Sequence, residues 1–340
     1  MNFSVRVSII RWTASSAVFI GLCAAAGAQT FKYVPFVPAD AAQTVPTAIS
    51  SRGDVAGYYF DIKSVQHGFF RSASGAIFSM DPPASHGTIV TGIDPQGLIS
   101  GYYLDKAGSY HGFVRRSAGS FISFDAASNA TNTLALATNS TGNIVGLFLD
   151  AQDAEHGFLR APDGTVTPLD VPGSTGTVAV SISDAGQITG NYTDSNGVQH
   201  GFLRGPKGLF RPFDPAGSVL TLPAAINLSG QIVGSYFDTS NLQHGFLRDA
   251  DGTTVSIDPP SATTTILTSV SLDGVAVGYY QTGSSEQHGF LRKADGTIVT
   301  CDPPGSTETS IVGINASRIV LGSENSHGGI FRGFVFSDAP

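Results

Sequence analysis

The tripeptide His-Gly-Phe recurs along this chain at an almost constant interval. Its histidines stand 44 or 45 residues apart, and Arg332, in Arg-Gly-Phe, stands 44 residues after the last of them. The histidines are His67, His111, His156, His200, His244 and His288. A glycine and an aspartate keep the same period, at Gly57, Gly101, Gly146, Gly190, Gly234, Gly278 and Gly322 and at Asp81, Asp125, Asp170, Asp214, Asp258 and Asp302. A fixed period of this length indicates a repeat architecture, and the glycines count seven repeats.

Each repeat has the pattern of four short strands. Within residues 177–214 the runs TVAVSIS, QITGNY, HGFLR and LFRPFD alternate or are rich in β-branched and aromatic residues. The turn sequences DAG and GPKG separate them and supply glycine where φ is positive. No helical period of 3.6 residues is sustained after residue 28. The predicted fold class is therefore all-β, with four-stranded antiparallel units of about 44 residues.

Radial repetition of such units is typical of a β-propeller, and seven repeats predict seven blades. Residues 31–37 resemble the fourth strand of a repeat, and residues 332–336 resemble the third. Pairing of these two segments would close the ring and leave no strand edge unpaired. We therefore predict one propeller domain over residues 29–340, closed by its N- and C-terminal strands.

Residues 1–28 have the pattern of a secretory signal peptide. Arg6 and Arg11 precede an apolar run, and the small residues 26–28 precede Gln29. The run is too short to cross a membrane as a helix, and no later segment is more apolar. We expect a secreted or periplasmic protein without a membrane span. A lipoprotein site at Cys23 is the alternative, although the bulky Leu22 precedes it.

Removal of residues 1–28 affects both cysteine content and charge. Cys301 would be the single remaining cysteine, which allows no intramolecular disulfide. We interpret it as a buried small apolar residue, with a reactive thiol as the alternative. Lys plus Arg would fall from 18 to 16 against 26 Asp plus Glu, a formal net charge of −10. No basic stripe is present, so we expect no nucleic-acid partner, and we expect a monomer.

The recurring segments resemble a known family. G-x-I-V-G-x-Y, D-x-x-G-x-x-H-G-F-L and F-D-P-P-G-S are together similar to the repeats of the bacterial extracellular HAF-repeat family, in which His-Ala-Phe is often His-Gly-Phe. The resemblance covers essentially all of residues 29–340. It implies an exported repeat protein of unestablished activity, and it brings no catalytic residues.

Five of the recurring histidines follow an aspartate by six residues; these aspartates are Asp61, Asp105, Asp150, Asp194 and Asp238. A carboxylate–imidazole hydrogen bond across the short loop would add about 1 to 3 kcal/mol to stability. The alternative, an oriented base or metal ligand, would place one such site in nearly every blade. We therefore interpret these histidines and aspartates as scaffold.

The second series of aspartates, from Asp81 to Asp302, precedes proline, glycine and other turn residues. We expect these carboxylates to accept hydrogen bonds from the turn that follows them. Calcium binding is the alternative, but the one-three-five spacing of oxygen ligands is missing. We therefore predict neither a metal site nor a cofactor.

Ligand contacts are expected where one repeat differs from the others. The fourth-to-first and second-to-third connections share one face of a propeller and are longer in this sequence, so we place a ligand there. The predicted binding residues are Tyr58, Tyr102, Tyr110, Tyr279, His86, Glu155, His327 and Arg332. The tyrosines would stack on a sugar or a protein partner, with packing between blades as the alternative.

The sequence after residue 28 contains no Gly-x-Ser-x-Gly, Walker, His-Glu-x-x-His or paired-cysteine zinc motif. We therefore predict a non-catalytic binding or interaction module for a glycan, a small ligand or a protein partner, with no assigned catalytic residue. The alternative is an extracellular lyase or hydrolase whose active site is assembled from several blades. His86, Glu155, His327 and Arg332 would then supply acid, base and anion contacts. A structural envelope or matrix protein is a third possibility.

Overall fold

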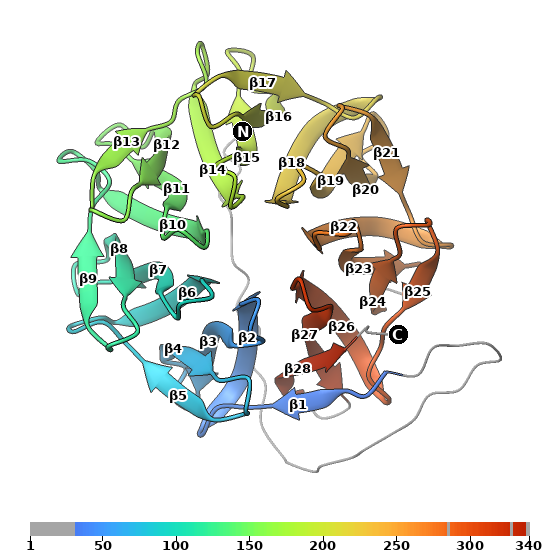
Figure 1. Ribbon diagram of the computed structural model, residues 1–340, viewed down its shortest axis with the longest axis horizontal. Helices are drawn as coiled ribbons and strands as arrows, with labels where there is room; N and C mark the ends of the chain where they lie inside the picture. Colours follow the sequence, from blue (N-terminus) through green and yellow to red (C-terminus); the bar gives the residue numbers. More distant parts are fainter. Residues whose placement is uncertain (1–30, 284–285, 327–328, 338–340) are drawn as a thin grey trace.

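The structure, a computed structural model, describes residues 31–283, 286–326 and 329–337. Within this range the regular elements are all strands, joined by turns and short loops. Figure 1 shows the strands gathered into seven sheets, or blades, arranged radially around one axis. The predicted all-β propeller is confirmed. Residues 1–28, which contain the predicted signal peptide and Cys23, lie outside the described residues.

Each blade is an antiparallel sheet of four strands, which are numbered here from the central axis outward. The first strands of blades 1 to 7 are β2 (Ala41–Ile49), β6 (Gly87–Ile93), β10 (Asn132–Thr138), β14 (Gly176–Ile182), β18 (Ser218–Ile226), β22 (Ala262–Val270) and β26 (Ser306–Ile314). The second strands are β3 (Val55–Asp61), β7 (Ile99–Leu104), β11 (Ile144–Leu149), β15 (Ile188–Thr193), β19 (Ile232–Asp238), β23 (Ala276–Thr282) and β27 (Ile319–Ser326).

The outer half of each blade contains the His-Gly-Phe strand and the strand that follows it. The third strands are β4 (Gln66–Arg71), β8 (Tyr110–Arg115), β12 (Glu155–Arg160), β16 (Gln199–Arg204), β20 (Gln243–Arg248), β24 (Gln287–Arg292) and β28 (Phe331–Ser337). The fourth strands are β5 (Ile77–Met80), β9 (Phe121–Phe124), β13 (Val166–Pro168), β17 (Phe210–Phe213), β21 (Thr254–Ile257), β25 (Ile298–Thr300) and, in blade 7, β1 (Val34–Phe36).

The two ends of the described chain close the ring, as predicted. Strand β1 pairs antiparallel with β28, with Val34 opposite Val335 and Phe36 opposite Gly333. A second link joins blade 7 to blade 1 at the other end of the sheets, where Nδ2 of Asn315 donates to the carbonyl oxygen of Ser50 at 2.9 Å. Each of the seven blades therefore has four strands.

The recurring Gly-Phe pair forms the core of every blade. The third-strand phenylalanine is fully buried in all seven blades, from Phe69 to Phe334. It packs against the recurring second-strand glycine, where an added Cβ in blade 1 would overlap Phe69 and the carbonyl oxygen of Val45. Glycine recurs with this period because the backbone and the phenyl ring approach closely at Gly57 and its equivalents, which leaves no space for a side chain.

The two faces of the ring differ in the connections that form them. The fourth-to-first and second-to-third connections form one face, called here the loop face, and the remaining turns form the opposite turn face. The longest connections, residues 125–131 and 169–175, are on the loop face. The connection 81–86 is also longer than the turns, whereas the other loop-face connections are not, so the predicted difference in length holds only for part of the ring.

Two further expectations concern cysteine and membranes. Cys301 is fully buried after β25, in the cluster that contains Val277 and Phe334, as expected. Within the described ranges no helix is long and apolar enough to cross a membrane.

Candidate functional site

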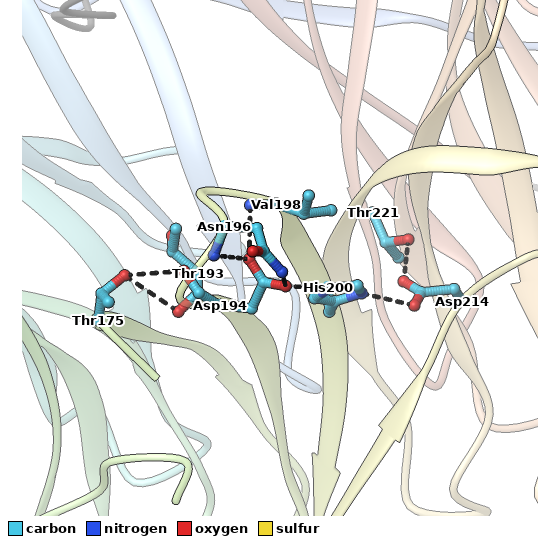
Figure 2. Close-up of polar contacts among 8 residues, drawn as sticks. All are labelled: Thr175, Thr193, Asp194, Asn196, Val198, His200, Asp214 and Thr221. Atoms are coloured by element: carbon cyan, nitrogen blue, oxygen red, sulfur yellow. Dashed lines mark hydrogen bonds and ion pairs between the residues drawn. The ribbon is translucent and has the colours of Figure 1, made fainter. Parts of the chain in front are cut away.

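The most regular polar feature of the structure is an Asp–His–Asp cluster, which Figure 2 shows for blade 4. Nδ1 of His200 lies 2.7 Å from Oδ2 of Asp214, and Nε2 lies 3.7 Å from Oδ2 of Asp194. The imidazole also lies against the ring of Tyr192, with 5.2 Å between centroids. The contacts of His200 therefore hold β15, β16 and the residue after β17 in fixed relative positions.

The same cluster occurs in the first five blades. The distance from Nδ1 to the aspartate 14 residues later is 2.7 to 3.1 Å, and the distance from Nε2 to the aspartate six residues earlier is 3.3 to 3.8 Å. In blade 6, His288 keeps the contact with Asp302 and has Glu286 at 3.9 Å. The pairing predicted from the sequence is therefore the longer of the two contacts. In every case the closer partner of the histidine is an aspartate of the second series.

The first series of aspartates keeps the predicted histidine contact and also caps its own loops, whereas the second series makes the closer histidine contact. Asp194 caps its own loop, because Oδ1 accepts from the backbone N–H groups of Asn196 and Val198 at 2.8 and 2.9 Å. Asp214 does not cap the turn that follows it. Its Oδ1 accepts a 2.5 Å hydrogen bond from Oγ1 of Thr221, on the first strand of blade 5. In blade 4 the cluster therefore joins neighbouring blades as well as neighbouring strands.

The charges of the clusters follow from these contacts. Burial lowers the pKa of His111, but the hydrogen bonds and negative charges of Asp125 and Asp105 outweigh it, so the pKa is raised. The pKa values of His156 and His244 are raised in the same way. The pKa of Asp194 is lowered, first by the backbone hydrogen bond from Val198. Both ring nitrogens of each histidine face carboxylates, which leaves neither as a free base or metal ligand.

In blade 7 two oppositely charged residues occupy the positions of this cluster. Glu324 stands where the other blades have the aromatic ring, and Arg332 stands opposite it where they have the histidine. Glu324 is buried, and burial raises the pKa of its carboxyl while the charge of Arg332 lowers it. Sequence analysis singled out Arg332 and missed Glu324. The available signal was a charged residue at a position that is aromatic in every other repeat.

Three of the predicted tyrosines come together between blades 1 and 3; we call Tyr58, Tyr102 and Tyr110 the tyrosine sector. Tyr102 and Tyr110 make an edge-to-face contact, with centroids 5.5 Å apart. The pKa of Tyr102 is raised to about 12, first by burial and then by the neighbouring Tyr58 and Tyr110. The backbone N–H of Tyr110 donates to Oδ1 of Asn132 in blade 3, a contact that the sequence did not predict.

The side of the sheet on which Tyr58 lies faces the next blade. Tyr58 is opposite Gly68 in the β3–β4 pairing. An added Cβ at Gly68 would meet Thr88 and Val90 of blade 2. The ring of Tyr58 is therefore directed into the seam between blades 1 and 2, in the direction of Tyr102.

The hydroxyl groups of the tyrosine sector differ from those of the buried tyrosines Tyr59 and Tyr236. The hydroxyls of Tyr59 and Tyr236 hydrogen-bond Ser79 and Ser256 at 2.7 and 3.1 Å. Within the described residues, the hydroxyls of the tyrosine sector have no such partner. Their rings are half-buried, so the sector offers polar groups next to aromatic edges.

The remaining predicted residues lie apart from one another. His86 is exposed in the connection before β6, and Glu155 is exposed at the start of β12 beside Gly176. Tyr279 is in blade 6, separated from Tyr58 by blade 7. His327 lies outside the described residues. Over the ranges that the structure describes, no group of three His, Cys, Asp or Glu residues could hold a metal ion.

Comparison with known proteins adds evidence on the fold. No protein-family model and no curated protein matches the chain. Streptogramin B lyase is 13% identical over 90% of this chain and 97% of its own, with a TM-score of 0.57. The propeller domain of the trilobed protease from Pyrococcus furiosus is 10% identical over 87% of this chain and 96% of its own, with a TM-score of 0.58.

A third similar structure is the BP39L lectin from Burkholderia pseudomallei. It is 10% identical over 88% of this chain and 97% of its own, with a TM-score of 0.54. At these identities the likenesses show the fold alone, because one fold supports many functions. The chain is a seven-bladed β-propeller in which β1 and β28 complete the last blade.

Proposed function

We propose that this protein is an exported, non-catalytic binding module that takes a hydroxyl-rich ligand, a glycan, at the tyrosine sector. The observation that carries the proposal is the group of aromatic hydroxyls without hydrogen-bond partners formed by Tyr58, Tyr102 and Tyr110. Phenol rings provide apolar surface for the C–H face of a sugar, and their hydroxyls bond to sugar hydroxyls. Asn132 orients the strand that carries Tyr110.

The rival lyase or hydrolase requires acid and base groups that act on one substrate. His86 and Glu155 are exposed on different blades, and Arg332 is on a third, beside Glu324. The titratable groups that do cluster, such as His200 with its two aspartates, occur in almost every blade and engage each other. Streptogramin B lyase shares the fold, which keeps the enzyme as the second candidate. A non-catalytic module fits the geometry better.

The compartment and the family belong to the same proposal. Residues 1–28 have the signal-peptide pattern, and the recurring segments resemble the extracellular HAF repeats. A lectin is among the propellers of similar fold, which is consistent with sugar binding by a protein of this shape. Binding of a glycan outside the cytoplasm accounts for both the sequence pattern and the tyrosine sector.

A glycan array followed by titration calorimetry tests the function. The variants Tyr102→Phe and Tyr110→Phe keep the rings and remove the hydroxyls, so we expect each to weaken binding of the selected oligosaccharide about fivefold to tenfold. Tyr236→Phe is the matched control, because the hydroxyl of Tyr236 is bonded to Ser256 in blade 5. Unchanged affinity in both sector variants contradicts the site. Cleavage of the oligosaccharide during incubation contradicts the non-catalytic assignment.

A further inference from the structure

A cavity of about 310 Å³ opens on the turn face, in the seam between blades 1 and 2. Phe70 and Phe78 of blade 1 form one wall, with Met80 and Ile99 also in contact with the space. Arg115 and the turn residues Gly97 and Ser117 of blade 2 form the other wall. The cavity is on the opposite face from the loop face, at which β8 begins with Tyr110.

The cavity exists because this seam is filled differently from others. In three seams the third-strand arginine covers a phenylalanine of the preceding blade, with Arg71 5.0 Å from the Phe36 centroid, Arg160 4.8 Å from Phe124 and Arg248 5.0 Å from Phe213. In the seam between blades 1 and 2 the preceding residue is Met80. Arg115 instead lies 5.9 Å from the ring of Phe121 in its own blade. The guanidinium is thereby left beside the seam rather than packed across it.

The apolar wall is specific to blade 1. Phe78 is opposite Phe70 in the β4–β5 pairing, and the two rings are stacked with 6.3 Å between centroids. The ring of Phe78 is 58% exposed. The equivalent residues in blades 2 to 6 are Ile122, Thr167, Arg211, Val255 and Val299. A flat aromatic face is therefore presented to solvent at this seam alone among those blades.

The charge in the cavity is positive. Among the described residues, no carboxylate lies within ion-pairing distance of the Arg115 guanidinium. Of the three arginines that pack across seams, Arg71 and Arg160 are 7% exposed and Arg248 is half-buried. Arg115 is also half-buried, but it borders the open space. A planar donor group thus stands next to a planar apolar face, a combination that matches an aromatic ring bearing a carboxylate.

We propose that the seam between blades 1 and 2 is a binding site for a small aromatic carboxylate. Its ring lies on the exposed face of Phe78, and its carboxylate accepts hydrogen bonds from the Arg115 guanidinium. A volume of about 310 Å³ accommodates a one- or two-ring acid of this class. The site is independent of the glycan-binding function proposed for the tyrosine sector.

Fluorescence titration with 2-naphthoate tests the site, with neutral 2-naphthamide as the matched probe. We expect 2-naphthoate to bind the unmodified protein at least tenfold more tightly than 2-naphthamide. Phe78→Ser and Arg115→Gln should each lower the affinity for 2-naphthoate at least tenfold. Arg204→Gln is the control variant, because Arg204 lies over Phe210 of its own blade in the same way and has no aromatic wall opposite it.

Absence of 2-naphthoate binding, or equal binding of 2-naphthamide, would overturn the proposal. Equal loss in the Arg204→Gln control would also overturn it, because the acid would then bind arginine without regard to the seam. Phe78 is largely exposed, so Phe78→Ser is expected to fold, and thermal melting confirms this. The comparison of the two probes on the unmodified protein gives a result even if Arg115→Gln fails to fold. Tyr102→Ala should leave 2-naphthoate binding unchanged, which separates this site from the glycan site.

Discussion

Oδ2 of Asp214 lies 2.7 Å from Nδ1 of His200, although the two residues are 14 positions apart in sequence. The contact joins the third strand of blade 4 to the connection that leads into blade 5. Because Oδ1 of Asp214 also accepts from Thr221, removal of the imidazole affects a junction between blades. The recurring histidine is therefore a structural residue.

His200→Ala should lower the free energy of unfolding by about 1 kcal/mol. The side chain is 26% exposed, so its hydrogen bonds are partly screened and fall at the low end of the usual range. Chemical denaturation at pH 6 measures the change. His86→Ala is the control, because His86 is an exposed histidine outside these clusters and should change stability little. Equal stability of His200→Ala and the parent protein would contradict the structural role.

Thermal stability should fall between pH 5.5 and pH 8. The folded-state pKa values of His111, His156 and His244 are raised, so their contribution is complete below the unfolded value of about 6.5 and is lost as pH rises through the folded values. The pKa of Asp194 and of its equivalents is lowered, so their contribution is present above about pH 3.9 and is lost as pH falls through the folded values. The melting temperature should therefore be highest between about pH 4 and 6.5.

Melting curves at constant ionic strength measure this dependence, and the triple variant His111→Ala, His156→Ala and His244→Ala is the control. Its melting temperature should change less between pH 5.5 and pH 8. Because the clusters are partly exposed, 0.5 M salt should also reduce the difference in the parent protein. A triple variant with the same pH profile as the parent would assign the dependence to other groups.

The sequence was sufficient to predict the blades but not the pairing inside the clusters. The glycine, histidine and aspartate periods follow from a packing unit that repeats, with Phe69 against Gly57 in blade 1 and the same contact elsewhere. The sequence predicts the nearer aspartate, Asp61, as the partner of His67. Its Oδ1 is occupied by the backbone N–H groups of its own loop. The β4–β5 register places Asp81 next to His67, and only that register identifies the closer pair.

The candidate sites could be predicted only in part, for a related reason. A departure from the repeat identified Tyr58, Tyr102 and Tyr110 as residues of interest. The free hydroxyls depend on which serine or threonine lies across the sheet, as Ser79 does for Tyr59. The cavity beside Phe78 depends on the sizes of the side chains that face each other across a seam between blades. The period of the repeats does not show which side chains these are.

Shortening the chain to begin at residue 39 should destabilise the closing blade. It removes β1, so β28 loses its antiparallel partner and the buried Phe36 leaves the space between Phe69 and Arg71. Loss of a buried phenylalanine alone costs about 3 to 5 kcal/mol, and the exposed edge of β28 favours association. We expect a lower melting temperature and dimers or larger species in light scattering. Phe36→Ala keeps the strand and should lower stability without association; association in that variant too would assign the effect to the core rather than to the strand edge.

Arg332→Gln should destabilise the protein more at pH 7 than at pH 4. Glu324 is 7% exposed, and burial raises its pKa while the charge of Arg332 opposes that rise. A carboxyl with a raised folded-state pKa loses stability as pH rises from its unfolded value toward its folded value, and removal of Arg332 makes this loss larger. Leaving the buried carboxylate without that charge should cost about 1 to 3 kcal/mol at pH 7. At pH 4 the carboxyl is largely protonated, so the cost should be smaller.

The double variant Glu324→Gln with Arg332→Gln isolates the interaction, because it removes both charges and keeps similar side-chain volumes. Its stability at pH 7 should lie closer to the parent protein than that of Arg332→Gln does. Denaturation curves of the parent, the two single variants and the double variant at both pH values complete the cycle. If Arg332→Gln costs the same at pH 4 and pH 7 and the second substitution restores nothing, Arg332 stabilises blade 7 through contacts other than its charge on Glu324.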